Sequence, residues 1–471
     1  MDLEQQNEKL PRLEFYGGTL GALLPFGAFI VGVIATALSG APDERGFWPI
    51  LLFALAIGLV LCKDRTAFSE TVISGMSQQI VMIMITAWLL ASSIGVLMTQ
   101  TGFVEALIWL ANLLHVQAVG IVIITFIICC IVSLSTGSSF ATILICSPLL
   151  YPTGGLLGAY LPALAGAIIA GATFGDFIAP ISDTTIASAL SQKADIGDTI
   201  KSRVKYILPA GALALLGFIL IALLKPQVMT VATVSEIGGD PKGLPMLLVP
   251  AVIIYLFLKK KHLLHGLLFG LVFGTVLGLV SGLLPLKSVL ILDLENYVAK
   301  SFIIDGINRA LGLSIFTILL MGLVATLKAS GLLNKLVDTA TKRAKTKHQG
   351  EGWIAGIMSL AVLLTTHTVV AILMVTDFTQ KTGERLEISS IRRANLLSLI
   401  GCVFPFILPY FIPVVLMANM TSTGGEFDIP KVSPIDVGLH NFMSWGLLVM
   451  TVITLFFNWR KTKNRNEYER Q

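Results

Sequence analysis

Charged residues are scarce in this chain of 471 residues. Asp, Glu, Lys and Arg make up 13% of it, against roughly 25% in a typical soluble domain. Hydrophobic residues make up 55%, and the mean hydropathy is +0.84. The apolar residues come in long runs with few charges, for example 20–38, 80–98 and 207–224. This composition excludes a soluble globular protein and predicts a polytopic membrane protein.

Several functional signatures are also missing. The five cysteines lack the CxxC or Cys/His spacing of metal sites, so we expect them to be packing thiols. The short alternating segments of a membrane β-barrel are absent, so the spans are helical. HExxH and GxSxG motifs and basic–aromatic patches are absent. We therefore predict an all-α membrane protein that is not an enzyme, needs no cofactor and binds no nucleic acid.

The apolar runs predict ten full spans. They lie near residues 15–38, 47–62, 78–110, 160–190, 205–224, 244–258, 263–284, 302–327, 394–418 and 441–459. Two further apolar stretches, 117–150 and 352–378, are interrupted by the polar runs SLSTGSS and TTHT. Unwound backbone at membrane depth is tolerated only where protein or a water-filled cavity covers it. We therefore expect re-entrant hairpins or broken helices that line a cavity.

Lys and Arg cluster in alternate connections between these spans, and cytoplasmic loops hold such an excess. The clustered residues are Lys63, Arg65, Lys193, Lys201, Arg203, Lys205, Lys259, Lys260, Lys261, Lys342, Arg343, Lys345, Lys347, Lys381, Arg385, Arg392, Arg393 and the tail 460–470. The topology that satisfies these connections has both termini in the cytoplasm, a first hairpin that opens outward and a second that opens inward.

The two halves of the chain show weak self-similarity at an offset near 230 residues. The paired segments are 95–107 with 324–336, 135–139 with 365–369, and 171–182 with 401–412. An odd number of crossings in each half makes the repeats inverted, as in secondary transporters. The predicted division is a cytoplasmic tail 1–12, a first inverted repeat 13–226, an external linker 227–243, a second inverted repeat 244–459 and a cytoplasmic tail 460–471.

Two aspartates interrupt an otherwise apolar span in the run GDFIAPISDTT, residues 175–185. A charge at membrane depth costs roughly 2.5–3.5 kcal/mol on insertion scales, so each needs a reason. Pro180 has no N–H to donate to the carbonyl of Asp176, so we expect the helix to break between Gly175 and Pro180. The resulting oxygen cluster is of the kind that hard cations prefer; it contains Asp176, Ser182, Asp183, Thr184 and Thr185. Burial disfavours a charged carboxylate, so a proton and a cation would compete for it.

The second half offers carbonyls where the first offers carboxylates. Pro405, Pro409 and Pro413 are each four residues apart and free the carbonyls four positions before them. A merely kinked, packed helix is the alternative. In the second hairpin Thr366 and His367 are candidates for the substrate pathway, with His367 either a pH sensor or a satisfied buried histidine.

Three hydroxyls and two basic residues complete the candidates. Thr136, Ser138 and Ser139 at the tip of the first hairpin either bind substrate or bond helices together. Arg309 either makes an i,i+4 pair with Asp305 or holds a substrate carboxylate. Lys328 either pairs with a carboxylate or extends its amine to the membrane surface.

The run GDFIAPISDTTIAS, which follows STGSSFATILICSPLL, resembles the NhaC family of Na+/H+ antiporters. This family lies within a larger ion-transporter superfamily whose members have G-D-x-x-S-P-[IL]-S-D-T-T in a broken helix. The positions that match are Gly175, Asp176, Pro180, Ser182, Asp183, Thr184 and Thr185. The sequence departs from the pattern at Phe177 and Ala179, which leaves the choice of cation open.

The resemblance implies an antiporter in the lipid bilayer of the cytoplasmic membrane that exchanges Na+, or Li+ or K+, for H+, with Na+ held at Asp176 and Asp183. Similar members of the superfamily exchange organic carboxylates or amino acids against Na+ or H+, and Arg309 or Lys328 would then hold the substrate. An organic solute requires extra volume and a cationic partner in the same cavity. A channel is less favoured by inverted repeats, and whether the chain forms a homodimer stays open.

Overall fold

The computed structural model describes residues 12–38, 44–113, 118–225, 239–259, 262–294, 297–332 and 345–468. These residues are almost entirely helical, which confirms the all-α prediction. The exception is a small antiparallel hairpin of β1 (Ile291–Asp293) and β2 (Val298–Lys300). Most of the predicted tail 1–12 and of the predicted linker 227–243 lies outside the described residues.

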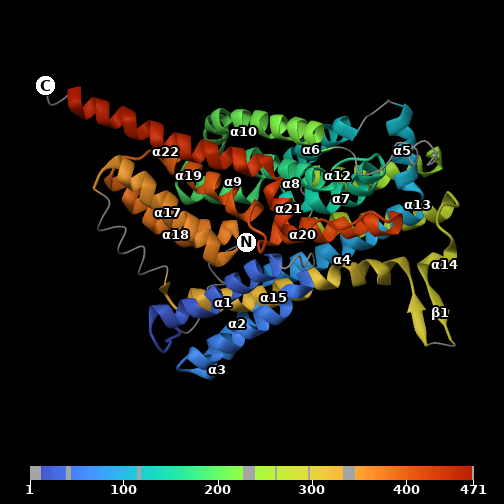
Figure 1. Cartoon of the computed structure of the whole chain (residues 1–471), viewed down its shortest axis with the longest axis horizontal. Coiled ribbons are helices and arrows are strands. Elements are labelled where there is room, and N and C mark those ends of the chain that lie inside the picture. The colour runs from blue at the N-terminus through green and yellow to red at the C-terminus, as the bar shows by residue number, and fades with distance from the viewer. Residues whose placement is uncertain are drawn as a thin grey trace.

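The helices of the first half run in the order shown in Figure 1. They are α1 (Thr19–Leu38), η2 (Glu44–Gly46), α2 (Phe47–Leu61), α3 (Arg65–Met76), α4 (Gln79–Gln100), α5 (Phe103–Leu113), α6 (Ala118–Thr136), α7 (Ser139–Leu156), α8 (Leu161–Ile178), α9 (Asp183–Ser191) and α10 (Ile196–Leu224).

The helices of the second half pack against those of the first half in one bundle. They are η3 (Pro241–Leu247), α12 (Leu248–Leu258), α13 (Leu263–Val280), α14 (Leu286–Val289), α15 (Phe302–Ala329), α17 (Lys347–Thr365), α18 (Thr368–Arg385), α19 (Ser390–Gly401), η4 (Phe404–Phe406), α20 (Ile412–Met420), η5 (Thr421–Phe427), α21 (Pro434–Leu439) and α22 (Phe442–Tyr468).

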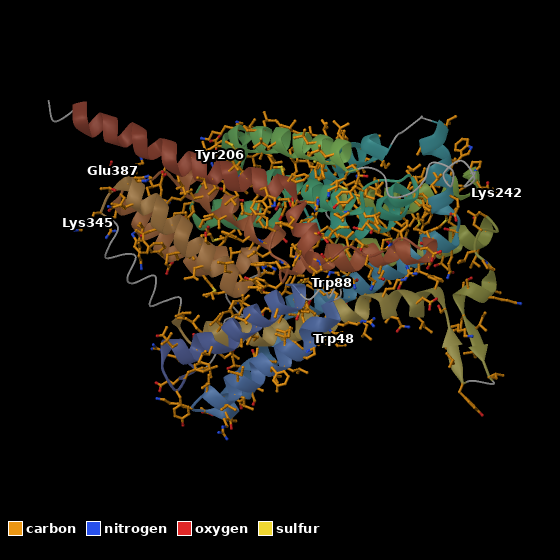
Figure 2. The ribbon with its side chains drawn as sticks, viewed as in Figure 1. Trp48, Trp88, Tyr206, Lys242, Lys345 and Glu387 are labelled. Atoms are coloured by element: carbon orange, nitrogen blue, oxygen red, sulfur yellow. The ribbon has the colours of Figure 1, made fainter. Side chains whose placement is uncertain are left out.

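Within the described ranges, seven helical segments are long and apolar enough to cross a membrane, so the chain is a polytopic membrane protein. They are Thr19–Thr36, Gln79–Gln100, Ser139–Leu156, Leu161–Ser191, Ile196–Ile221, Leu263–Val280 and Phe302–Ala329. Four shorter apolar segments lie at Phe47–Leu61, Gly120–Thr136, Pro241–Leu256 and Phe442–Leu455. Lys345 and Glu387 lie at one end of the bundle and Lys242 at the opposite end (Figure 2), as expected for a protein whose two ends face water.

Helical hairpins occupy both apolar stretches that the polar runs interrupt. The first is α6 and α7, which turn at Gly137 with φ 65°; the second is α17 and α18, which turn at Thr366 with φ 53°. The left-handed region is readily accessible to glycine and strained for a β-branched residue. Each hairpin therefore turns through one residue with positive φ, although the residue type differs.

Three predictions about the spans are wrong in detail. The predicted span 78–110 is two helices, because α4 ends where Gly102 adopts φ 72°. Helix α3 lies where the sequence suggested a connection between spans. A search for apolar runs does not detect this helix, because one of its faces is polar. Helix α10 begins at Ile196, so Arg203 lies inside a helix and is buried, as is Arg393 in α19. These arginines are not the exposed loop charges that the positive-inside count assumed.

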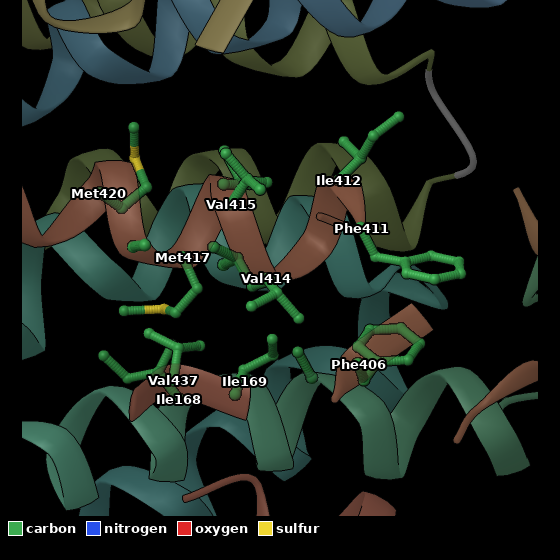
Figure 3. Packing of buried hydrophobic residues seen from close by; sticks show 14 of the residues in the cluster. Ile168, Ile169, Phe406, Phe411, Ile412, Val414, Val415, Met417, Met420 and Val437 are labelled. Carbon is green, nitrogen blue, oxygen red and sulfur yellow. The ribbon is translucent and has the colours of Figure 1, made fainter. Parts of the chain in front are cut away.

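Close helix packing positions the centre of the bundle. A Cβ on Gly171 would meet Cys129 of α6 at 2.4 Å, and a Cβ on Gly175 would meet Ser133 at 2.4 Å. Glycines therefore let α6 and α8 approach closely. Gly175 lies within α8 rather than at its end, so it serves this packing. Figure 3 shows side chains of α20 packed over Ile168 and Ile169 of α8, so elements of the two halves share one core.

Candidate functional site

A cavity of about 600 Å³ lies where both hairpin tips meet both interrupted spans. Its lining includes Thr136, Ser138, Ser139, Asp176, Asp183, Thr184, Thr366, His367, Pro405 and Pro413. The fold therefore brings together in one place candidate residues from several separate motifs of the sequence. Trp88 of α4 forms part of an apolar wall of the same cavity.

The first interrupted span breaks between α8 and α9. Helix α8 ends at Ile178, two residues before Pro180, and α9 begins at Asp183. The hydroxyl of Thr184 donates to the Asp176 carbonyl at 3.0 Å, and that of Thr185 donates to it at 3.5 Å. Side chains therefore cap the Asp176 carbonyl, which Pro180 leaves without an N–H. The sequence alone suggested that this carbonyl would be free to bind an ion, and that expectation is wrong.

The Asp176 carboxylate is buried, with 6% of its surface exposed. The Ser182 hydroxyl donates to Oδ1 at 2.7 Å, the Thr184 hydroxyl donates to Oδ1 at 3.4 Å, and the Ser139 hydroxyl donates to Oδ2 at 3.4 Å. No Lys, Arg or His within the described ranges forms an ion pair with it. Ser139 belongs to the first hairpin, so the carboxylate joins the hairpin tip to the helix break.

Asp183 differs from Asp176 in its surroundings. It is exposed, lines the cavity, and accepts no hydrogen bond from any described residue. It is the first residue of α9, where the helix dipole favours a negative charge. The two carboxylates interact electrostatically. One carboxylate is thus held by hydroxyls, and the other stands free at the cavity surface.

The other hydroxyls at the hairpin tips mainly complete the backbone. Ser138 caps α7, since its hydroxyl accepts a hydrogen bond from the N–H of Ala141 at 3.2 Å. The Thr136 hydroxyl lies 3.5 Å from that of Thr142. The Thr366 hydroxyl donates to the carbonyl of Thr365 at 2.8 Å. These residues line the cavity, yet their hydroxyls are engaged within their own hairpin.

His367 is different, because its buried Nδ1 has no hydrogen-bond partner among the described residues. Lys328, near the end of α15, interacts with it electrostatically but does not line the cavity. Arg309 forms an ion pair with Glu426 instead of the expected Asp305, and it also lies outside the cavity lining. Neither predicted charge partner therefore meets Asp176 or Asp183.

The second interrupted span has no charge at its break. The Gly401 carbonyl, which Pro405 leaves without an N–H, accepts a hydrogen bond from the Thr368 hydroxyl at 2.9 Å, and the neighbouring Cys402 carbonyl accepts one from the Ser444 hydroxyl at 2.9 Å. Pro405 and Pro413 line the cavity and Pro409 does not. The lining described here contains no Lys or Arg; its basic side chains are His262 and His367. The cavity is therefore negative on one side and largely apolar on the other.

One buried residue behind the break was missed by the sequence analysis. Arg203 donates to the carbonyl of Phe177 at 2.7 Å and to the hydroxyl of Thr185 at 2.8 Å. The positive-inside count cannot separate it from the exposed Lys201 two residues earlier. Its hydrogen-bond partners Phe177 and Thr185 belong to the same motif as Asp176. These contacts are visible only in the folded structure.

Comparison with known proteins gives a consistent picture. Residues 5–223 match the Na+/H+ antiporter family. The chain is 27% identical over 192 residues to the malate-2H(+)/Na(+)-lactate antiporter of Bacillus subtilis, which covers 40% of each protein. It is 35% identical over 97 residues to the Na(+)/H(+) antiporter NhaC of Alkalihalophilus pseudofirmus, which covers 21% of each. The matches thus span less than half the length of either curated relative.

Among solved structures, the chain resembles MtrF of Neisseria gonorrhoeae, described as belonging to a class of antimetabolite efflux pumps. The superposition covers 96% of this chain and 97% of that one, with a TM-score of 0.36 and 14% sequence identity.

Proposed function

We propose that the chain is a secondary antiporter that exchanges Na+ for H+ across the cytoplasmic membrane, because residues 5–223 match the Na+/H+ antiporter family. Li+ or K+ would take the place of Na+ if the cavity selects them. The observation that supports this most directly concerns Asp176. Its buried carboxylate lines the cavity of about 600 Å³, and the side chains that donate hydrogen bonds to it are all hydroxyls.

The hydroxyls around Asp176 suit both occupants of such a site. A hydroxyl can donate a hydrogen bond or offer a lone pair. With the site empty, Ser139, Ser182 and Thr184 donate to the carboxylate; with a cation bound, the same oxygens would rotate to become ligands. Hard cations prefer oxygen donors of this type. Asp183 adds a second negative charge at the cavity surface, where an arriving cation would first be attracted.

The exchange follows from competition for one carboxylate. A proton on Asp176 removes the charge that attracts the cation, and a bound cation disfavours the protonated form. If the cavity opens to one side of the membrane at a time, one occupant must leave before the other enters. We propose that the two halves are inverted repeats with cytoplasmic termini, and that their hairpins and interrupted spans provide this alternating access.

A second candidate is exchange of a small carboxylate or amino acid coupled to Na+ or H+. The cavity volume favours it, since 600 Å³ is within the range of small-molecule pockets and far more than a bare ion fills. The absence of Lys and Arg from its described lining weighs against it. In the described lining, the groups left to hold a carboxylate are the imidazoles of His262 and His367 and the N-terminal ends of helices, among them α7 and α18.

The test is proton movement in proteoliposomes when Na+, Li+ or K+ is added to an imposed pH gradient. Asp176→Asn should slow exchange by about 100-fold, because it removes a buried charge that binds the ion. Asp183→Asn should raise the half-saturating cation concentration by about tenfold. Asp377→Asn is the matched control, because Asp377 is exposed on α18 and lies outside the cavity lining.

Two results would overturn the proposal. Wild-type exchange that persists in Asp176→Asn would remove this residue from the binding site. A parent protein that ignores cations alone, but moves protons once lactate, malate or an amino acid is added, would favour the second candidate.

A further inference from the structure

Arg203 of α10 is a fully buried guanidinium, with 0% of its surface exposed. Its Nη1 donates to Phe177 O at 2.7 Å and to Thr185 Oγ1 at 2.8 Å. Its Nη2 donates to Ser188 Oγ at 2.8 Å, and its Nε donates to Asn395 Oδ1 at 3.2 Å. These bonds use four of the five N–H groups of the side chain. The residue therefore ties the end of α8, helix α9 and helix α19 to α10.

No carboxylate in the described part of the chain lies within ion-pair distance of Arg203. An unpaired charge in such a place costs several kcal/mol unless a negative charge nearby compensates it. Arg203 interacts electrostatically with Cys402 and Asp176; because a thiol is ordinarily neutral, the compensating negative charge is that of Asp176. Thr185 lies between them, because its hydroxyl accepts from Arg203 and donates to the Asp176 carbonyl.

We propose that Arg203 is a positioning residue and a permanent counter-charge for Asp176. It holds the broken end of α8 and keeps the interior electrically balanced when neither a cation nor a proton occupies the carboxylate. This inference deepens the proposed function and rests on it.

The separation of the two charges is what makes this role useful. A guanidinium in direct contact with Asp176 would occupy the carboxylate oxygens and compete with the transported ion. Arg203 lies instead on the far side of the break, so Oδ1 and Oδ2 remain held only by hydroxyls that can rearrange. Its hydrogen bonds to the backbone and to Asn395 of α19 fix its position from both halves of the chain.

The expected effect on pH dependence has a definite sign. A positive charge near a carboxylate favours its charged form, so removal of Arg203 should make deprotonation of the site require a higher pH. The other titratable groups that face Asp176 are Asp183 of α9, Cys402 directly after α19 and, across the cavity, His367 directly before α18. All three are retained in the variants below.

The experiment compares Arg203→Gln, Arg203→Lys and Arg393→Gln with the parent in proteoliposomes, over a series of pH values. Arg393 is a matched control: it is buried, donates to Gln192 and to the Ile388 carbonyl, and does not contact the motif. Arg203→Gln should shift the pH of half-maximal exchange by about one unit toward alkaline values. Arg203→Lys should keep the parent pH while lowering the maximal rate, and Arg393→Gln should not shift the profile.

A lower rate for Arg203→Gln with an unshifted profile would show a purely structural role and overturn the counter-charge. If Arg203→Gln does not accumulate as folded protein, the Asp176→Asn, Arg203→Gln double variant decides. Removal of both charges should restore folded protein, and failure to restore it would overturn the inference.

A binding readout separates this inference from the proposed function. The melting temperature of the purified protein, followed against pH without added cations, reports protonation of the site even in a protein that moves no protons. The alkaline displacement of this curve in Arg203→Gln, relative to Arg393→Gln, is expected whatever the transported solute. A parent inactive toward cations refutes Na+/H+ exchange; an undisplaced melting curve refutes the counter-charge.

Discussion

The two interrupted spans occupy similar places around one cavity, but their breaks differ in chemistry. The break between α8 and α9 brings carboxylates and hydroxyls to the cavity wall, and a buried arginine, Arg203, lies behind it. The break between α19 and α20 brings prolines and apolar side chains, and the carbonyls of Gly401 and Cys402 are capped by Thr368 and Ser444. One fold feature thus serves two purposes: the first break provides charge, and the second provides shape and close packing against α8 (Figure 3).

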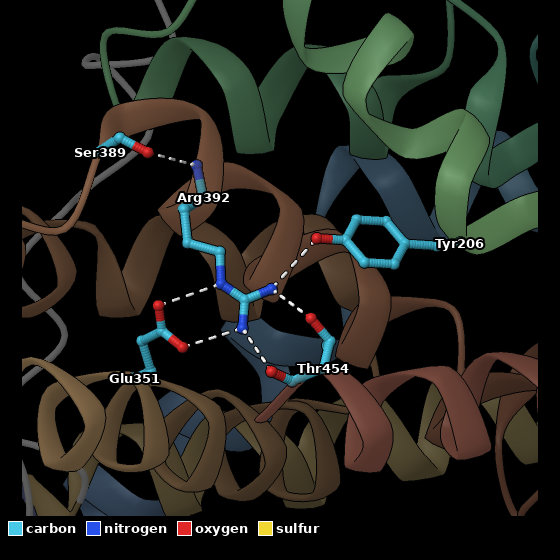
Figure 4. A network of polar contacts seen from close by, with 5 residues as sticks. All are labelled: Tyr206, Glu351, Ser389, Arg392 and Thr454. Carbon is cyan, nitrogen blue, oxygen red and sulfur yellow. Dashed lines mark hydrogen bonds and ion pairs between the residues drawn. The ribbon is translucent and has the colours of Figure 1, made fainter. Parts of the chain in front are cut away.

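Buried charges follow the same contrast. Asp176 and Arg203 are separated by the first break, and neither forms a direct ion pair with any residue that the structure describes. In the second half, Arg392 forms a bidentate pair with Glu351, with Nε to Oε1 at 3.1 Å and Nη2 to Oε2 at 2.9 Å. Tyr206 and Thr454 accept further hydrogen bonds from Arg392 (Figure 4). A direct pair stabilises an assembly of helices, whereas a separated pair leaves the carboxylate free to bind an ion.

The largest effect on stability is therefore expected in the second half. Glu351→Gln leaves the Arg392 charge buried without its carboxylate, which should cost about 3 kcal/mol in the free energy of unfolding. The measurement is the melting temperature of the purified protein, together with the pH profile of exchange. Because the pair lies outside the cavity lining, the profile should keep its midpoint.

Lys63→Met provides the control for this substitution. Lys63 pairs with Glu14 at 3.1 Å, with both side chains at least half exposed, and its ammonium lowers the pKa of the Glu14 carboxyl. Water screens such a pair, so the melting temperature should not change measurably. A shifted pH midpoint in Glu351→Gln would mean that the pair belongs to the transport machinery, and the distinction between the two halves would fail.

The next effect compares one hydroxyl from each break. Ser182→Ala removes the shortest hydrogen bond to Asp176, and bonds to charged groups contribute about 1.5–3 kcal/mol, so cation affinity should fall by about tenfold. Thr368→Ala removes a donor to the Gly401 carbonyl, which should lower stability by about 1–3 kcal/mol and leave affinity unchanged. Cation titrations of proton flux and melting curves on both variants separate the two outcomes.

Equal losses of affinity in the two variants would contradict this division. They would indicate that the carbonyls of the second break also bind the ion when the cavity is occupied. Ser444→Ala, which removes the cap from the Cys402 carbonyl, would then show whether that effect extends along the break.

Long apolar runs made the helical membrane fold predictable, and two polar interruptions located both hairpins. Asp176 stood out because a carboxylate in an apolar run has an obvious cost. Capping of the Asp176 carbonyl could not be predicted, because it depends on where Thr184 and Thr185 fold back. Arg203 was hidden for a related reason: its identity suggests a loop charge, and only tertiary contacts show that it is buried.

The division of α4 and α5 was also beyond hydropathy. The residues on both sides of Gly102 are apolar, and the break comes from a left-handed backbone conformation rather than from a polar run. A backbone feature of this kind ends a helix without changing the hydropathy of the surrounding residues, so a search for apolar runs does not detect it.

The smallest expected effect concerns the hairpin turns. Gly137 of the first hairpin adopts φ 65° and lies against the backbone of Ile181. A Cβ at this position would lie 2.9 Å from the carbonyl carbon of Ile181. Thr366 of the second hairpin adopts φ 53° although its side chain is β-branched. Thr366→Gly relieves roughly 1–2 kcal/mol of left-handed strain but loses roughly 0.5–1 kcal/mol to chain entropy and one hydrogen bond to Thr365. The net gain in stability should therefore stay below about 1 kcal/mol, with exchange rates unchanged. A large loss of exchange in this variant, with the melting temperature kept, would mean that the strained turn itself takes part in transport, and that the second hairpin is more than a scaffold for the cavity.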